Sequence, residues 1–162
     1  MDFLLEFKFL ILLAAANGTP VIAKTILGQR FAHPVDAGVQ FWDGQPVLGP
    51  SKTVRGIAVS LVATILASAL LGMGWKLGAL VSLMSMAGDL LSSFLKRRMK
   101  LAPSSMVLGL DQLPEALLPL LVCAQILGFS LADIVAIAAA FFVGELLLSR
   151  LLFRLHLRDT PY

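Results

Sequence analysis

A single acidic residue, Asp89, stands inside a long apolar stretch, seven residues before the basic run that begins at Lys96. On an α-helix, Asp89, Ser93 and Lys96 share one face, because residues three and four apart are neighbours on a helix surface. Seven residues of helix span roughly 10 Å. An acid, a hydroxyl group and a base along one face would line a polar cleft. The alternative is a structural Asp89, neutralised by a proton or by a neighbour on its own helix.

A segment rich in acids and glycines precedes this stretch. Asp36 and the Asp43-Gly44 dipeptide come first, and a Lys52-Thr53-Val54-Arg55 cluster follows. Glycine lets the backbone approach a ligand closely, and successive amides form anion-binding concavities. Lys52 and Arg55 then predict phosphate binding. Asp43-Gly44 alone is also typical of a turn, and the two basic residues also suit the anchoring of a membrane helix.

A second polar segment follows Lys96. Its basic run, Lys96-Arg97-Arg98, is able to pair with phosphates or with anionic lipid headgroups. Further on, Asp111 either caps the next helix or helps to hold a divalent cation, since magnesium is typically bound by one or two carboxylates together with substrate phosphates.

The elements that carry these residues are long and apolar. Of the 162 residues, 58% are hydrophobic and only 14% are charged. An average soluble domain has about 25% charged residues. This composition excludes a disordered chain and a nucleic-acid-binding tail, and the length fits one membrane-embedded domain over residues 1–162. Five stretches approach the roughly 20 apolar residues of a membrane span. They are Leu4–Ile22, Gly56–Leu71, Leu77–Leu95, Leu113–Phe129 and Leu131–Phe153.

The links between these stretches alternate in length. Two links are tight, and Ser130 with Asp133 predicts a capping box at the start of the last helix. The other two, about Ala23 to Arg55 and Lys96 to Gln112, are long and lie on one side, together with the C-terminus. Eleven of the 13 basic residues fall on that side, and only Lys8 and Lys76 fall on the other. Because cytoplasmic loops carry the Lys and Arg excess, we expect both long loops and the C-terminus in the cytoplasm and the N-terminus outside. The eleven are Lys24, Arg30, Lys52, Arg55, Lys96, Arg97, Arg98, Lys100, Arg150, Arg154 and Arg158.

Taken together, these motifs resemble a known superfamily. Residues of the third stretch and the following segment resemble the signature region of the phosphatidate cytidylyltransferases: Gly88-Asp89, Ser93, Lys96-Arg97-Arg98 and Asp111-Gln112. The earlier segment is similar to the CDP-archaeol synthase branch in Pro34, Asp36, Gly38, Asp43-Gly44, Gly49, Lys52-Thr53 and Arg55-Gly56. The second polar segment is shorter than in the bacterial enzymes and lacks their histidine and second aspartate, which leaves the number of metal ions open.

The resemblance implies an activity. It implies an all-α, five-span enzyme of the cell (inner) membrane that joins a lipid phosphate to CTP and releases pyrophosphate. It also implies Mg²⁺ as cofactor, CTP, a lipid phosphate and membrane lipids as partners, no nucleic acid, and an active site facing the cytoplasm. By this resemblance Asp89, Asp111 and Lys96 are the catalytic residues, and the two aspartates bind the metal. The implied nucleotide- and phosphate-binding residues are Asp36, Asp43, Gly44, Ser51, Lys52, Thr53, Arg55, Gly56, Ser93, Arg97, Arg98 and Gln112.

Elementary chemistry agrees with this reaction, because joining two polyanions requires cationic groups where negative charge develops. The acceptor phosphate is largely ionised near neutral pH, so no strong general base is needed. The apolar side chains do not discriminate between ether-linked, diacyl and other lipid acceptors. Two alternatives remain: a CTP-dependent kinase of a polyprenol-like alcohol, and a small transporter or membrane assembly subunit without enzymatic activity.

Overall fold

The computed structural model describes residues 2–103, 105 and 107–154, and within them the chain forms five α-helices. Each of the five predicted stretches forms one helix, so the all-helical class is confirmed. Arg158, one of the eleven basic residues, lies outside the described residues. The helices are α1 (Phe3–Leu27), α2 (Val54–Leu70), α3 (Trp75–Arg98), α4 (Gln112–Leu127) and α5 (Leu131–Arg154).

The helices differ in how well they suit a membrane. Three segments of the described chain are long and apolar enough to cross one: Phe3–Leu27, Trp75–Arg98 and Leu131–Arg150. The helices α2 and α4 are apolar but have only 17 and 16 residues. The helix α1 continues five residues beyond the predicted end at Ile22, through the polar residues Lys24 and Thr25. Hydropathy therefore marks the apolar part of α1 and misses its polar last turn.

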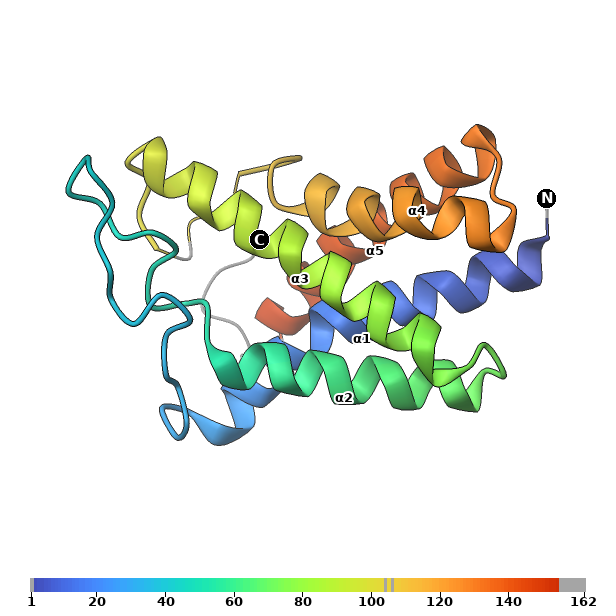
Figure 1. Ribbon diagram of the computed structural model, residues 1–162, viewed down its shortest axis with the longest axis horizontal. Helices are drawn as coiled ribbons and strands as arrows, with labels where there is room; N and C mark the ends of the chain where they lie inside the picture. The colour runs from blue at the N-terminus through green and yellow to red at the C-terminus, as the bar shows by residue number, and fades with distance from the viewer. Residues whose placement is uncertain (1, 104, 106, 155–162) are drawn as a thin grey trace.

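The helices run back and forth along one axis (Figure 1). Each helix contacts the next one in the chain, α5 returns to α1, and α1 also contacts α3. The segments between α1 and α2 and between α3 and α4 lie at one end of the bundle, and the start of α1 lies at the opposite end. Both long loops are therefore gathered at the same end, as the alternating link lengths predict.

Small polar side chains pack α1, α2 and α3 closely together. Pro20 has no backbone N–H, so the carbonyl of Ala16 lacks its usual helical partner. The Ser60 hydroxyl of α2 donates to this carbonyl at 2.8 Å and lies 2.9 Å from the Ser82 hydroxyl of α3. At Gly78 of α3, an added Cβ atom would lie 2.6 Å from a backbone oxygen of α2. These three helices form a frame whose backbones approach as closely as small residues permit.

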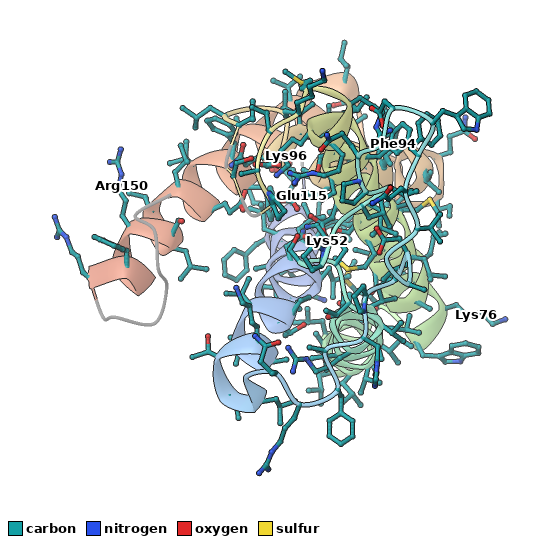
Figure 2. All side chains as sticks on the ribbon, turned by 90° about the vertical axis from the view of Figure 1, so that its left-hand side faces the viewer. Lys52, Lys76, Phe94, Lys96, Glu115 and Arg150 are labelled. Carbon is teal, nitrogen blue, oxygen red and sulfur yellow. The ribbon has the colours of Figure 1, made fainter. Side chains whose placement is uncertain are left out.

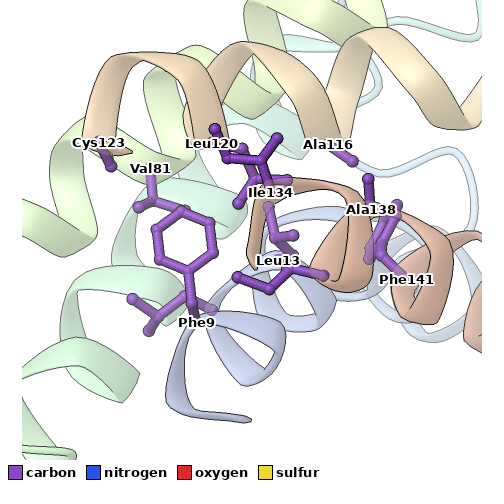
Figure 3. Close-up of a cluster of buried hydrophobic side chains, with 11 residues drawn as sticks. Phe9, Leu13, Val81, Ala116, Leu120, Cys123, Ile134, Ala138 and Phe141 are labelled. Atoms are coloured by element: carbon purple, nitrogen blue, oxygen red, sulfur yellow. The ribbon is translucent and has the colours of Figure 1, made fainter. Parts of the chain in front are cut away.

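Larger apolar side chains attach α4 and α5 to this frame (Figure 3). Phe9 and Leu13 of α1 meet Leu120 of α4 and Ile137 of α5 in one buried cluster. The first turn of α5 begins with the predicted capping box. There, the Ser130 amide donates to the Asp133 carboxylate at 2.8 Å, and the Asp133 amide donates to the Ser130 hydroxyl at 3.3 Å. The apolar cluster thus joins α4 and α5 to α1 and α3.

Candidate active site

The backbones of α3 and α4 approach each other closely beside Asp89. At Gly88, an added Cβ atom would lie 2.3 Å from the Pro114 carbonyl oxygen and 2.6 Å from the Glu115 Cα atom. Only a residue without a side chain fits between the two backbones. Gly88 therefore brings the first turn of α4 directly against the helix that carries Asp89.

Lys52 of the first loop reaches Asp89 across 37 residues of sequence. Its Nζ atom lies 2.5 Å from the Asp89 Oδ1 atom. The two side chains keep 20% and 25% of their surface exposed, so solvent and solutes can reach the pair. The ion-pair partner of Asp89 therefore comes from a distant loop and not from its own helix.

A second lysine–aspartate pair joins α3 to the end of the second loop. Lys96 Nζ lies 2.6 Å from Asp111 Oδ1, and the side chains are 8% and 20% exposed. Lys96 also donates to the Ser105 carbonyl at 2.8 Å, while the other Asp111 oxygen accepts the Val107 amide at 2.9 Å. Asp111 stands at the N-cap position of α4 but makes no capping hydrogen bond. Its predicted capping role is wrong, because both carboxylate oxygens are already used by Lys96 and by the loop.

A third ion pair fastens the first loop to the end of α3. Arg98 donates to Asp43 Oδ1 at 2.6 Å and to the Pro46 carbonyl at 2.6 Å. Its guanidinium lies 4.5 Å from the ring centre of Phe41 and 5.0 Å from that of Phe94. Such stacking on aromatic faces adds to the charge attraction. Arg98 thereby holds the hairpin formed by residues 39–47 on the last turn of α3.

Asp36 organises the interior of the first loop. Its carboxylate accepts the amides of Leu48 and Gly49, each at 2.8 Å, and that of Gly38 at 3.1 Å. Burial raises the pKa of this carboxyl, but the amide donors of Gly49, Leu48 and Gly38 outweigh it, and the net pKa lies below its usual range. The carboxylate is thus occupied by backbone donors and shapes the loop from inside.

The predicted residues around the start of α2 connect the loop to the frame. Thr53 caps α2 by accepting the Gly56 amide at 3.1 Å. Gly56 faces Pro20 of α1, at 3.5 Å from an added Cβ atom. Arg55 donates to the Gly28 carbonyl at 3.0 Å and also to the Arg30 carbonyl. In this structure these three residues serve the junction of α1, the loop and α2.

The remaining predicted residues lie close to the second loop or on the first. Arg97, only 2% exposed, donates to the Ala102 carbonyl at 2.8 Å, and Gln112 accepts the Gly109 amide at 2.9 Å. Ser93 is buried in α3. Gly44 turns the hairpin with a positive φ of 75°, and Ser51 is exposed next to Lys52.

Glu115 has no predicted role, although it lies beside the first ion pair. It is 6% exposed, and it interacts electrostatically with Glu145 of α5, with Asp89 and with Lys52. Figure 2 looks onto the loop end, with Lys52, Lys96 and Glu115 near the centre of the bundle and Arg150 at its edge. The position of Glu115 in the first turn of an apolar helix was the sequence signal for a functional role, because polar groups at membrane depth are costly.

The site thus gathers alternating charges at one end of the bundle. Two lysines and two aspartates form neutral pairs, and basic side chains surround them. No cluster of three or more metal-binding side chains occurs among the described residues. The donor set nevertheless fits Mg²⁺, which prefers carboxylate oxygens and takes its remaining ligands from phosphates and water. Asp89 uses only Oδ1 for Lys52, and no hydrogen bond from the described residues reaches its Oδ2.

Comparisons with known proteins match this fold and this chain. The chain superposes on a solved structure described as an intramembrane enzyme for archaeal membrane lipids biosynthesis. The TM-score is 0.63 and the identity 30%, over 84% of this chain and 89% of the other. The all-helical fold and its polar end define the same class, a membrane-embedded enzyme of lipid biosynthesis.

Sequence relatives narrow the class. The family model described as CarS-like, CDP-archaeol synthase, matches residues 1–162. A CDP-archaeol synthase of Hyperthermus butylicus is 40% identical over 65% of this chain and 66% of its own length. That of Sulfurisphaera tokodaii is 30% identical over 91% of this chain and 89% of its own length. The chain belongs to the CDP-archaeol synthase family of cytidylyltransferases.

Proposed function

We propose that the protein transfers the cytidylyl group of CTP to a membrane lipid phosphate and releases pyrophosphate. The observation that carries the proposal is the pair of lysine–aspartate contacts at the loop end, in a chain of this family. Lysines and carboxylates at one place supply both partners of a metal–triphosphate complex: ammonium groups for the phosphates and carboxylates for the metal.

In this reaction an oxygen of the lipid phosphate forms a bond to the α-phosphorus of CTP. The bond from that phosphorus to the bridging oxygen of the β-phosphate breaks, and pyrophosphate leaves with the electron pair. Lys52 and Lys96 neutralise charge that builds up on the phosphates, and Arg97 and Arg98 lie within the same basic end. The acceptor oxygen is already ionised, which accounts for a site without a positioned histidine.

Asp89 and Asp111 are the residues that would hold Mg²⁺. The bound ion would neutralise triphosphate charge and orient the leaving pyrophosphate. Both carboxylates are partly exposed, and each binds its lysine through a single oxygen. The remaining ligands would come from the nucleotide and from water.

The membrane arrangement belongs to the same proposal. All five helices span the bilayer, with the loop end in the cytoplasm and the start of α1 outside. The bias of basic residues toward the loop end supports this orientation. The helices α2 and α4 are about 25 Å long at 1.5 Å per residue, somewhat less than a hydrocarbon core of about 30 Å. A site at the loop end meets soluble CTP while the lipid tails remain in the bilayer.

The test is product analysis with purified protein in lipid nanodiscs. We expect pyrophosphate and a CDP-lipid when CTP, Mg²⁺ and an ether-linked or diacyl lipid phosphate are supplied together. A CTP-dependent kinase would instead release CDP and would act on the lipid alcohol. A transporter or assembly subunit would release neither product. If none of the lipid phosphates in the panel supports pyrophosphate release, the proposal is wrong.

A further inference from the structure

Both carboxylates assigned to the metal already hold a lysine in this structure. Lys52 lies 2.5 Å from Asp89, and Lys96 lies 2.6 Å from Asp111. Within each pair the charges cancel. The side chains are between 8% and 25% exposed, so the pairs are shielded from water more than surface ion pairs are.

This arrangement penalises the binding of either ligand alone. A metal ion on Asp89 would compete with Lys52 for the charge of one carboxylate, even when it binds through Oδ2, and would repel the nearby ammonium group. A triphosphate on Lys52 would leave Asp89 unpaired beside the buried carboxyl group of Glu115, which already interacts with both. Removing one partner from a shielded ion pair is strongly unfavourable, because the charge that remains is poorly solvated.

The two ligands together remove the penalty. If the metal takes the aspartates while the triphosphate takes the lysines, every charge exchanges one partner for another. No side chain is left unpaired at the end of the exchange. The pairs are exposed enough for this, since Lys52 and Asp89 keep 20% and 25% of their surface in contact with solvent.

We propose that the Lys52–Asp89 and Lys96–Asp111 pairs make the divalent cation and the nucleoside triphosphate bind cooperatively, by exchange of ion-pair partners. The proposal rests on the proposed function, because it takes the metal and CTP as ligands of this site. It assigns the lysines a second role, as counter-ions that keep the metal site closed until a nucleotide arrives.

The experiment measures binding without a lipid acceptor, so that no turnover occurs. CTP is titrated with and without Mg²⁺ by calorimetry, and Mn²⁺ alone is titrated by electron paramagnetic resonance, with correction for the metal–CTP complex in solution. For the wild type we expect Mg²⁺ to raise CTP affinity at least about tenfold, and CTP to raise metal affinity by the same factor.

Two variants test the two halves of the exchange, one through the binding of CTP alone and the other through the binding of the metal alone. Asp89→Asn removes the counter-charge of Lys52, so it should bind metal-free CTP more tightly than the wild type does, although it is expected to be inactive. Lys52→Met releases Asp89, so it should bind Mn²⁺ without nucleotide more tightly than the wild type. In both variants the coupling factor should fall toward one.

Matched controls lie at the opposite end of the bundle. Asp2→Asn and Lys76→Met change the net charge by the same amounts, and both residues are exposed there. They should leave the coupling factor unchanged. If Asp89→Asn elutes as an aggregate, Asp111→Asn takes its place, because it releases Lys96 in the same way.

The outcomes separate this inference from the proposed function. A wild type that forms CDP-lipid but binds CTP equally well with and without Mg²⁺ overturns the exchange and leaves the function standing. If neither Asp89→Asn nor Asp111→Asn binds CTP more tightly than the wild type in the absence of Mg²⁺, the exchange is overturned as well. A wild type that binds no CTP under either condition overturns both.

Discussion

Gly88 offers the sharpest test of how the site is assembled. Replacement by alanine would place a Cβ atom 2.3 Å from the Pro114 carbonyl oxygen and 2.6 Å from the Glu115 Cα atom. Ordinary contact begins near 3.4 Å, so α4 must move by about 1 Å relative to α3. Both opposing atoms belong to the backbone, so no side chain can turn aside to make room.

The displacement should cost both stability and activity. Overpacking of this kind typically costs about 1–3 kcal/mol. A shift of about 1 Å between the α3 and α4 contributions to the site is enough to lower turnover roughly a hundredfold. The assay measures kcat for pyrophosphate release well below the melting temperature of the variant, so that loss of fold is separated from loss of alignment.

Two other glycines provide matched controls for Gly88→Ala. At Gly78, an added Cβ atom meets backbone at 2.6 Å as well, but at the contact between α2 and α3. Gly144 of α5 has nothing within 4 Å of an added Cβ atom. We expect Gly78→Ala to lower the melting temperature but to reduce kcat much less than Gly88→Ala does. Gly144→Ala should lower neither the melting temperature nor kcat. Equal losses of kcat in Gly88→Ala and Gly78→Ala, or full activity in Gly88→Ala, would refute the reasoning.

Three further predictions concern the loops and the frame. The lowered pKa of Asp36 means that its ionised form stabilises the loop above its unfolded pKa of about 3.9, and that this stability is lost as the pH falls through the lower folded value. Asp36→Asn should therefore lower hydrogen-exchange protection of the Leu48 amide roughly tenfold at pH 7, and the difference from the wild type should disappear as the pH falls through the lowered pKa of the folded state. Arg98→Lys keeps the charge but loses the planar contact with the two aromatic rings, so limited proteolysis should cut the 39–47 hairpin faster than in the wild type. Ser60→Ala leaves the buried carbonyl of Ala16 without its donor and should cost about 1–3 kcal/mol of stability, read as a lower melting temperature; an unchanged value would contradict the role given to this hydroxyl.

The sequence predicts the helices and the importance of Asp89, because both leave local signals. Five apolar stretches stand out by hydropathy, and one acid inside such a stretch is conspicuous. The Ser130–Asp133 cap is equally local, since the two residues are three apart. The predicted and observed ends of α1 differ because the helix continues into polar residues, where hydropathy carries no information.

The partners of the charged residues leave no local signal in the sequence. Lys52 reaches Asp89 from 37 residues away, and Arg98 reaches Asp43 from 55 residues away. No periodicity encodes such distances, because the course of the loop decides them. Phe94, one turn before Arg98, offered a local hint of stacking, whereas Phe41 on the opposite side did not. The meeting of Glu115 with Glu145 likewise depends on how α4 packs against α5.

The small-residue packing of the frame has a mechanical consequence for the two ion pairs. Lys52 lies on the first loop, two residues before α2, and Asp89 lies on α3, so the first pair joins the end of this loop to the frame. Asp111 lies at the start of α4, which is joined to the frame by bulky apolar side chains and by the contact at Gly88. The second pair therefore crosses the interface between α3 and α4, which also contains the close contact at Gly88. Opening the first pair frees the end of the first loop from α3. Opening the second pair removes one of the contacts that hold the start of α4 against α3.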